Sequence, residues 1–429
     1  MTSVNSDLIL DRLQRLHPKT IDLSLGRLER LLVALDHPER RLPPVVHIAG
    51  TNGKGSTLAM LDAMLQADGR TVQRYISPHL VRFNERILFN GEPIDEAAFT
   101  RALDLAEQAN QGQPITFFEI TTAVAFLAFL ERKADILLLE TGLGGRLDAT
   151  NVVDHPHLTM ISTVSYDHQA FLGDKLGQIA SEKAGILKRG VPCILGPQDD
   201  EGLAVIEARA EELDVPLTVH GRDWSVERQG QDLIVRTKQT TITLPLPGLQ
   251  GPHQIENAGL ATVAALQLGD LGPSTKAMTE GLPQASWPAR LQPLRSGPLP
   301  ALLPVGSTLW LDGGHNPAAG EAMARCFDKD DPRPLHLIVG MLNTKDTSGF
   351  LAPLIPLSAS LQTVPVPDEP ASRSADDLAA EARSIGANAR AASSIESALL
   401  HLEEQEKSSI RVLICGSLYL AGHVLRANS

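Results

Sequence analysis

The chain has 429 residues, of which 43% are hydrophobic and 21% charged, so its composition is that of a globular protein and its length favours two domains. Its 38 basic and 51 acidic side chains give a formal charge of −13 without a basic cluster, which argues against nucleic acid as the main ligand. No apolar run approaches the roughly 18 residues of a membrane span, so we expect neither a membrane segment nor a signal peptide.

The three cysteines, Cys193, Cys326 and Cys415, are far apart and follow no zinc-binding or paired spacing. Each lies in or beside an apolar stretch, which favours small buried side chains. We therefore expect reduced thiols and a cytoplasmic location.

Leucines at helical spacing over residues 5–35 predict two helices divided by Pro18. The next segment, VVHIAGTNGKGST (45–57), begins as an apolar strand, breaks into a glycine-rich turn and continues into a helical pattern. This order directs backbone N–H groups and a helix N-terminus at a phosphate, and Lys54 adds a positive charge.

This glycine-rich turn departs from the usual phosphate loop. That pattern has Ser or Thr directly after the lysine, whereas here Gly55 intervenes before Ser56 and Thr57. An ordinary glycine turn is the alternative interpretation, but the flanking strand and helix favour phosphate binding.

A second strand, predicted over 71–77, leads into SPHLVRFNERI (77–87). The arginines and the histidine of this segment indicate either a binding loop at the strand's carboxyl end or a polar surface loop. Asp95 is placed to cap the next helix, and a long apolar helix is expected over 117–134.

The apolar run over 135–141 predicts a buried parallel strand that ends at Glu140. A carboxylate at a strand end beside a phosphate loop is typical of a nucleotide–Mg²⁺ site. A further strand over 158–164 is followed by Asp167 and His168, and His168 is as consistent with a structural role as with a ligand or orienting role.

The helix predicted over 174–188 carries Lys183 and Lys188, and their spacing alone indicates a solvated face. A strand over 192–196 and a helix over 201–214 complete another β–α unit. Residues 216–247 contain segments with period-two alternation, PLTVH, WSVERQ, DLIVRT and TTITLPL, which predict a small antiparallel sheet. A helix is expected over 253–269.

A boundary rich in Pro, Gly and Ser falls near 286–304, and a new α/β pattern follows it. Its expected strands cover 308–314, 335–341, 361–367 and 410–416. The fold class is therefore α/β with two domains. Residues 1–290 form a P-loop mononucleotide-binding domain with a mainly parallel sheet and a small antiparallel sheet, and 291–429 form a Rossmann-like α/β domain.

The motifs AGTNGKGS, SPHLVRFNERI, ETGLGGRLDATN, SYDHQAFLG, IASEKAGILK, HQIENA, WPARL, DGGHNP and CGSLYLAG occur in this order. Together they resemble the dihydrofolate synthase/folylpolyglutamate synthase family, within the Mur-type ATP-dependent ligases, over essentially residues 20–425. The glycine after the phosphate-loop lysine is itself a feature of that family. The resemblance implies that ATP phosphorylates a substrate carboxylate and that the amine of L-glutamate attacks the acyl phosphate, giving an amide, ADP and phosphate.

The resemblance also implies roles for individual residues. The phosphate loop would comprise Gly50, Thr51, Asn52, Gly53, Lys54, Gly55 and Ser56. Further contacts to ATP would come from Asn257, Arg290 and Asp312. The magnesium ligands, expected for two Mg²⁺ ions, would be Ser77, Glu140 and His168, together with Lys183 as a carbamate, which replaces the solvated-face interpretation of this lysine.

The resemblance places the substrates as well. The pterin-containing acceptor, dihydropteroate or a folate, would lie near Arg82 and the stretch Asp148, Ala149, Thr150 and Asn151. L-Glutamate would lie near His315, Ser417 and Tyr419. Since the amine of glutamate must lose a proton before it attacks, His315 is a candidate base, with simple binding of glutamate as the other role.

Three alternatives stay open at this point. A Mur-type cell-wall ligase would need a further domain before the phosphate loop, and Lys54 lies too near the N-terminus for one. A nucleotide-dependent switch would not need Glu140, His168 and Lys183 together. Within the folate family the enzyme has either both activities, which GRLDATN and FNERI favour, or folylpolyglutamate synthase activity alone. We expect a monomer.

Overall fold

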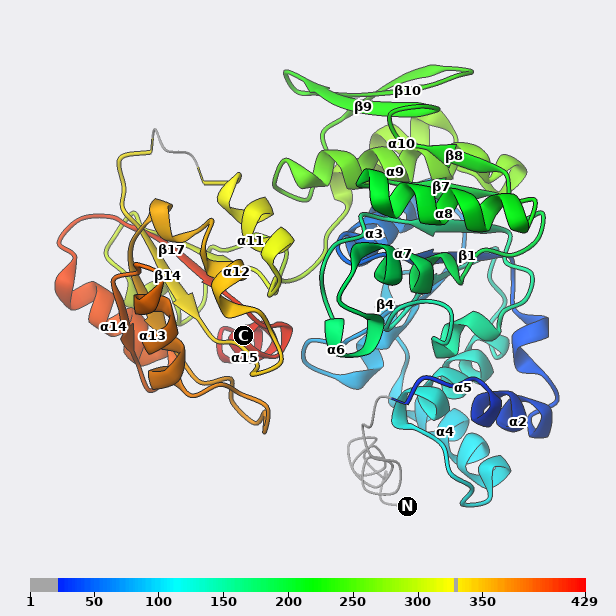
Figure 1. The fold of residues 1–429 in the computed structure, drawn as a ribbon, viewed down its shortest axis with the longest axis horizontal. Helices are drawn as coiled ribbons and strands as arrows, with labels where there is room; N and C mark the ends of the chain where they lie inside the picture. Colours follow the sequence, from blue (N-terminus) through cyan, green and yellow to red (C-terminus); the bar gives the residue numbers. More distant parts are fainter. Residues whose placement is uncertain (1–21, 328–330) are drawn as a thin grey trace. The chain divides into compact units, whose positions relative to one another are not determined.

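The computed structural model describes residues 22–327 and 331–429, which divide into two compact units (Figure 1). The first unit contains 22–164, 169–247 and 256–285. The second contains Ser165–His168, Gly248–Ile255 and Ser286–Ser429. Within these described residues, no helix is both long and apolar enough to cross a membrane. The helix predicted before Pro18 lies outside them.

The first unit is built on an eight-stranded sheet of order β4-β3-β2-β5-β1-β6-β7-β8. Six of its strands run parallel: β1 (Val45–Ala49), β2 (Val72–Tyr75), β5 (Ile136–Glu140), β6 (Leu158–Ile161), β7 (Cys193–Leu195) and β8 (Leu217–Val219). The edge strands β3 (Ile87–Phe89) and β4 (Glu92–Pro93) are antiparallel. β1 lies between β5 and β6, so the loops that leave these strands meet at one edge of the sheet.

Helices cover this sheet. They are α2 (Gly26–Ala34), α3 (Lys54–Ala67), α4 (Glu96–Asn110), α5 (Phe117–Leu130), α6 (Gln169–Leu172), α7 (Leu176–Ala184), α8 (Asp200–Glu212), α9 (His253–Gln267) and α10 (Thr275–Gly281). α2, α4 and α5 pack on the sheet face that carries Leu137 and Leu139, and the α7–α8 pair packs further along the same face, against Ile161 and Leu195. α10 ends against α3, where a Cβ at Gly281 would collide with the backbone of Ala63.

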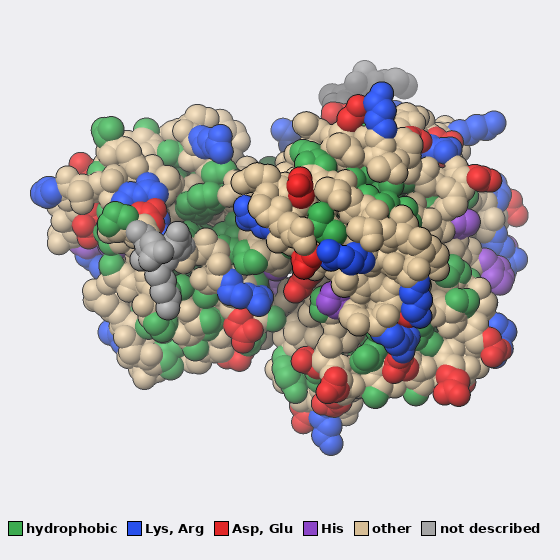
Figure 2. All heavy atoms as spheres, turned by 90° about the horizontal axis from the view of Figure 1, so that it is seen from above, with side chains coloured by type: hydrophobic (Ala, Val, Ile, Leu, Met, Phe, Trp, Pro, Cys, Tyr) green, Lys and Arg blue, Asp and Glu red, His purple; other side chains and the backbone are tan. Residues whose placement is uncertain are grey.

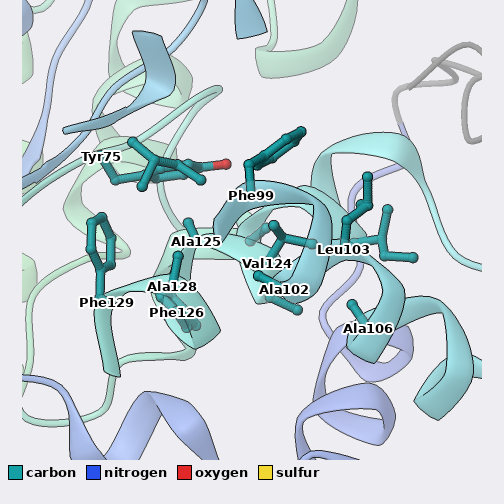
Figure 3. Packing of buried hydrophobic residues seen from close by; sticks show 14 of the residues in the cluster. Tyr75, Phe99, Ala102, Leu103, Ala106, Val124, Ala125, Phe126, Ala128 and Phe129 are labelled. Carbon is teal, nitrogen blue, oxygen red and sulfur yellow. The ribbon is translucent and has the colours of Figure 1, made fainter. Parts of the chain in front are cut away.

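Aromatic side chains fill the core between α4, α5 and the sheet. Tyr75 from β2, Phe99 from α4, and Phe126 and Phe129 from α5 are fully buried or nearly so (Figure 3). α5 begins with a capping box in which Thr116 accepts from the Glu119 N–H and Glu119 accepts from the Thr116 N–H. The expected buried apolar helix is present and is buried almost all round, but it ends at Leu130 and does not reach residue 134.

The small antiparallel sheet contains β9 (Trp224–Gln229), β10 (Asp232–Thr237) and β11 (Thr241–Pro245). The prediction that the segment PLTVH belongs to it was wrong. This segment forms β8, which pairs in parallel with β7 and extends the main sheet. The alternation of side chains reveals a strand but not the neighbour with which it pairs.

The second unit has a six-stranded sheet of order β12-β13-β17-β14-β15-β16. The strands are β12 (Gln292–Leu294), β13 (Thr308–Leu311), β14 (Leu335–Val339), β15 (Ser358–Thr363), β16 (Ala389–Ala391) and β17 (Arg411–Cys415), and all but β12 are parallel. Its helices are α11 (Pro317–Ala324), α12 (Thr347–Leu351), α13 (Ala375–Ser384), α14 (Ile395–Gln405) and α15 (Leu418–Ala427). α11, α12 and α13 pack on the face that carries Leu337 and Leu413.

The predicted fold class is confirmed: two α/β units, a mainly parallel sheet and a small antiparallel sheet. The short strands β3, β4, β12 and β16 and the helices α6, α10, α12 and α15 were not predicted. The expected strand over 308–314 stops at Leu311, because Asp312, Gly313 and Gly314 already form the loop that follows it.

Candidate functional site

The glycine-rich turn lies between β1 and α3, as the sequence predicts. Gly53 has a φ of 87° and immediately precedes α3, whose first residues are Lys54, Gly55 and Ser56. The N–H groups in the first turn of a helix are not used by the helix's own hydrogen-bond ladder and point out of its N-terminus, which is the arrangement that binds phosphate. The ammonium of Lys54 folds back over this loop and donates to the carbonyl of Gly50 at 3.0 Å.

Two neighbouring segments hold the loop in place. A Cβ at Gly50 would collide with Ser162 Oγ, which itself donates to the carbonyl of Asn52 at 2.7 Å. A Cβ at Gly53 would collide with Asn257 Oδ1, so this predicted ATP contact from α9 lies directly against the phosphate loop. The N–H of Thr51 donates to the carbonyl of Thr163 at 2.9 Å. Sequence reasoning did not identify the role of Ser162.

Two predicted magnesium ligands lie beside the loop. Glu140 ends β5, is 5% exposed, and has Oε1 3.9 Å from Lys54 Nζ. Its other carboxylate oxygen accepts from the Ser77 N–H at 3.4 Å. Ser77 Oγ is buried and has no hydrogen-bond partner among the described residues. A buried carboxylate next to an unsatisfied hydroxyl is a donor set that suits a hard divalent cation.

Lys183 lies on α7 and is only 4% exposed, so the solvated-face interpretation from spacing was wrong. The loop after Glu140 packs tightly on this helix, because a Cβ at Gly145 would lie 2.7 Å from the carbonyl of Glu182. Asn151 Nδ2 ties the two together by donating to the carbonyls of Arg146 and Gly185, at 2.9 and 3.0 Å.

The stretch Asp148, Ala149, Thr150 and Asn151 is buried and begins the short 3₁₀ helix Ala149–Val152. The Asp148 carboxylate accepts from the N–H groups of Gly142 and Leu143, at 2.9 and 2.8 Å, and from the N–H and hydroxyl of Thr150. Thr150 Oγ1 in turn lies 2.8 Å from His47 Nε2 on β1. Burial raises the pKa of Asp148 and lowers that of His47 to about 3. The Asp148 and Thr150 side chains thus connect the Glu140 loop to β1, a structural role that the sequence did not indicate.

Arg82 is exposed at the start of the 3₁₀ helix Phe83–Arg86. The Glu85 carboxylate accepts from the N–H groups of Leu80, Val81 and Arg82 and so fixes the backbone of this loop. The Arg82 guanidinium is therefore presented from a rigid turn, as a substrate-binding role would require.

In the second unit, the predicted ATP contacts Arg290 and Asp312 lie in adjacent turns. Asp312 is 5% exposed and accepts from the N–H groups of Leu291 and Gly314, at 2.9 and 2.7 Å. It thereby holds the turn around Arg290, whose flanking residues Ala289 and Leu291 both have positive φ. Arg290 Nη1 passes within 3.1 Å of the place that a Gly313 Cβ would occupy.

The expected glutamate-binding residues lie at neighbouring strand ends of the second unit. The Gly416 N–H donates to the carbonyl of Gly314 at 3.0 Å and joins the loop of His315 to the loop of Ser417. Ser417 is buried and caps α15 by accepting from the Tyr419 N–H at 3.2 Å, while Tyr419 is 40% exposed.

His315 lies in a charged cluster around Asp167. His315 Nε2 is 3.3 Å from Asp167 Oδ2, and Lys345 Nζ donates to Asp167 Oδ1 at 2.7 Å. Burial opposes the ionisation of Asp167, but its hydrogen bond with His315 and its electrostatic interactions with His315, His168 and Lys345 outweigh this effect and lower the pKa of Asp167 well below its usual range. His168, with a φ of 51°, belongs to the same unit, whereas Ser77, Glu140 and Lys183 belong to the first.

Charged side chains of both signs are mixed on the surface: basic and acidic side chains are interspersed on the face that Figure 2 shows. Across residues 22–327 and 331–429, no group of three or more His, Cys, Asp or Glu side chains is arranged to hold a metal ion. A cation would therefore have to use other donors as well, such as Ser77 Oγ.

Comparison with known proteins identifies the family. Residues 48–265 match the Mur ligase middle domain, and residues 304–427 match the C-terminal domain of dihydrofolate synthetase. The dihydrofolate synthase/folylpolyglutamate synthase of Bacillus subtilis is 34% identical over 417 residues, which cover 93% of this chain and 94% of that protein. The chain belongs to the dihydrofolate synthase/folylpolyglutamate synthase family. The Escherichia coli enzyme of this family is 33% identical over 97% of this chain and 94% of its own length.

Solved structures of this family show the same fold. The chain matches Escherichia coli FolC in complex with DHPP and ADP at a TM-score of 0.88 and 32% identity, over 99% of this chain and 97% of that one. It also matches a bifunctional folylpolyglutamate synthase/dihydrofolate synthase with Mn, AMPPNP and L-glutamate bound, at a TM-score of 0.87 and 32% identity, over 99% and 98%. The sequence-based assignment to this ligase family is confirmed.

The position of Asp148 gives a testable prediction. In Asp148→Asn, an amide NH₂ replaces one acceptor oxygen and faces buried N–H donors, so we expect the free energy of unfolding to fall by about 1–3 kcal/mol. Urea unfolding followed by circular dichroism measures this change. The exposed Asp174→Asn in the same unit is the control, with a change within about 0.5 kcal/mol. A variant with unchanged stability and a raised KM for the acceptor would instead show direct contact between Asp148 and substrate.

Proposed function

We propose that this chain is an ATP-dependent, ADP-forming ligase that joins L-glutamate to dihydropteroate, giving dihydrofolate, and extends folates by γ-linked glutamates. The observation that carries the proposal is the phosphate loop between β1 and α3, with Glu140 and Ser77 beside it. Full-length similarity to enzymes named for both activities supports it. A folylpolyglutamate synthase from Lacticaseibacillus casei is 32% identical over 414 residues, so a single activity is the second candidate.

The proposed first step is transfer of the γ-phosphoryl group of ATP to the acceptor's carboxylate. The N–H groups of Gly53–Ser56 and the Lys54 ammonium hold the phosphates and neutralise charge as it shifts to the leaving ADP oxygen. Asn257 lies against this loop and would contribute to the ATP site. Arg290 and Asp312 are proposed as further ATP contacts because of the motifs in which they lie. In the second step the glutamate amine attacks the acyl phosphate, phosphate leaves, and an amide forms.

The amine must lose its proton before or during this attack. His315 either accepts that proton or binds glutamate, and Ser417 and Tyr419 complete the glutamate site. Arg82 contributes to binding of the pterin-containing acceptor. The proposal also includes a monomeric enzyme and a cytoplasmic location.

The residues around Glu140 fit a divalent cation. Ser77 Oγ and the Glu140 carboxylate would hold it. We further propose His168 and a carbamate on Lys183 as ligands, and a requirement for two Mg²⁺ ions. Bound Mg²⁺ would neutralise the phosphate oxygens of ATP. A lysine that is 4% exposed is costly to bury as a cation, whereas a carbamate would be stabilised as an anionic ligand.

The function is tested by ADP release from the purified protein with MgATP and L-glutamate, with dihydropteroate or tetrahydrofolate as the acceptor. We expect glutamate-dependent release with both acceptors. We expect Lys54→Ala to abolish it while retaining the wild-type circular dichroism spectrum, because the phosphates lose their cation. The exposed Lys133→Ala serves as the matched control and should retain wild-type turnover.

Release with tetrahydrofolate alone would establish the single-activity candidate. Release with neither acceptor, or wild-type turnover by Lys54→Ala, would contradict the proposal.

The carbamate is tested separately. We expect Lys183→Ala to lose activity and to recover part of it when a small carboxylate such as formate replaces the missing ligand. Lys175 is exposed and immediately precedes α7, so Lys175→Ala is the control and should remain active without added formate. The mass of the intact protein is measured after purification in bicarbonate. If a fully active protein lacks the additional mass of CO₂, Lys183 acts unmodified.

A further inference from the structure

Asp167 occupies the centre of a polar cluster whose role the sequence analysis did not predict. It lies on Ser165–His168, a segment grouped with the second unit although its neighbours in the chain belong to the first. One carboxylate oxygen accepts from Lys345 Nζ at 2.7 Å. The other accepts from Asn316 Nδ2 at 3.0 Å and lies 3.3 Å from His315 Nε2.

The cluster is largely excluded from solvent. The side chains of Asp167 and Lys345 are each 11% exposed, and that of His315 is 22% exposed. In such surroundings a hydrogen bond between charged groups is stronger and better oriented than at a surface. Asp167 is therefore held firmly enough to orient a neighbouring ring.

The donors to Asp167 are themselves fixed by the fold. Asn316 caps α11, because its Oδ1 accepts from the Ala319 N–H at 2.9 Å. Lys345 precedes α12, which Asp346 caps by accepting from the Gly349 N–H at 2.9 Å. The loops that carry Asn316 and Lys345 follow parallel strands of the same sheet. The position of the Asp167 carboxylate therefore depends on donors whose backbone is fixed by the fold.

The imidazole of His315 faces this carboxylate through Nε2, at 3.3 Å from Asp167 Oδ2. A carboxylate that accepts from Nε2–H leaves Nδ1 as the nitrogen with a lone pair in the neutral ring. Whichever role His315 has toward glutamate, that role depends on which nitrogen is available.

We propose that Asp167 is a positioning residue, which fixes the ring orientation and tautomer of His315 through Nε2 while Lys345 and Asn316 hold its carboxylate. This inference rests on the proposed function of His315 at the glutamate site. Asp167 itself does not touch the reacting atoms. It acts on glutamate only through His315.

The first test is kinetic. In Asp167→Asn we expect kcat/KM for glutamate to fall roughly 10- to 100-fold, because misplacement of a group that acts on the substrate has costs of this order. The change in KM for ATP should be smaller than the change in kcat/KM for glutamate, since the phosphate loop itself belongs to the first unit. Asp167→Glu keeps a carboxylate and should recover part of the loss.

The second test does not require turnover. With histidine labelled at Cε1, the NMR signal of His315, assigned through His315→Gln, should shift in Asp167→Asn. Asp331→Asn is the matched control, because Asp331 is also paired with a cation of the second unit, Arg333 at 2.7 Å. Neither the His315 signal nor the kinetics should change in this control.

The outcomes separate this inference from the proposed function. If the His315 signal shifts in Asp167→Asn but the wild-type protein shows no glutamate-dependent ADP release, the proposed function is refuted and the contact between Asp167 and His315 stands. An unshifted signal with wild-type kinetics would refute the positioning role. A lower KM for glutamate in Asp167→Asn would also refute it, since Asp167 would then be occupying the place of a substrate carboxylate. If Asp167→Asn does not fold, Asp167→Glu decides by the same two measurements.

Discussion

The close approach of the phosphate loop to its neighbours is the constraint on which the rest of the first unit depends. The loop can present its N–H groups only because Gly50 and Gly53 lack side chains where Ser162 and Asn257 press against them. Ser162 follows β6 and Asn257 lies on α9, so two other elements must be in place before the loop has its shape. A strand order with β1 between β5 and β6 brings Glu140 to the same edge. The strand order of the sheet therefore places the phosphate loop and Glu140 together, as the proposed chemistry requires.

A second set of contacts keeps the proposed metal-binding residues together. Glu140 lies on a strand and Lys183 on a helix, and the buried stretch from Asp148 to Asn151 connects the two elements. The resemblance placed this stretch near the pterin substrate, whereas its side-chain hydrogen bonds lie within the unit. The contact of Asp148, Ala149, Thr150 and Asn151 with the pterin-containing substrate stays a prediction.

Much of this fold could be predicted because its signals are local. Continuous apolar runs mark β1, β5 and β17, and the glycines mark the phosphate loop. The remainder depends on pairing between distant segments. β8 has the alternation of an antiparallel strand but pairs in parallel with β7, and Asp167 meets Lys345 across 178 residues of sequence. Lys183 was misjudged from spacing because its burial depends on the Gly144–Gly145 turn that packs on α7.

The central claim is that the phosphate loop directs the γ-phosphoryl group of ATP to the carboxylate of the acceptor. The most direct measurement uses dihydropteroate labelled with oxygen-18 in its carboxylate, with MgATP and L-glutamate, and mass analysis of the released phosphate. An acyl-phosphate route breaks the carbon–oxygen bond of the labelled carboxylate, so one labelled oxygen should appear in each phosphate formed with product. Unlabelled phosphate alongside formation of the amide would contradict the account.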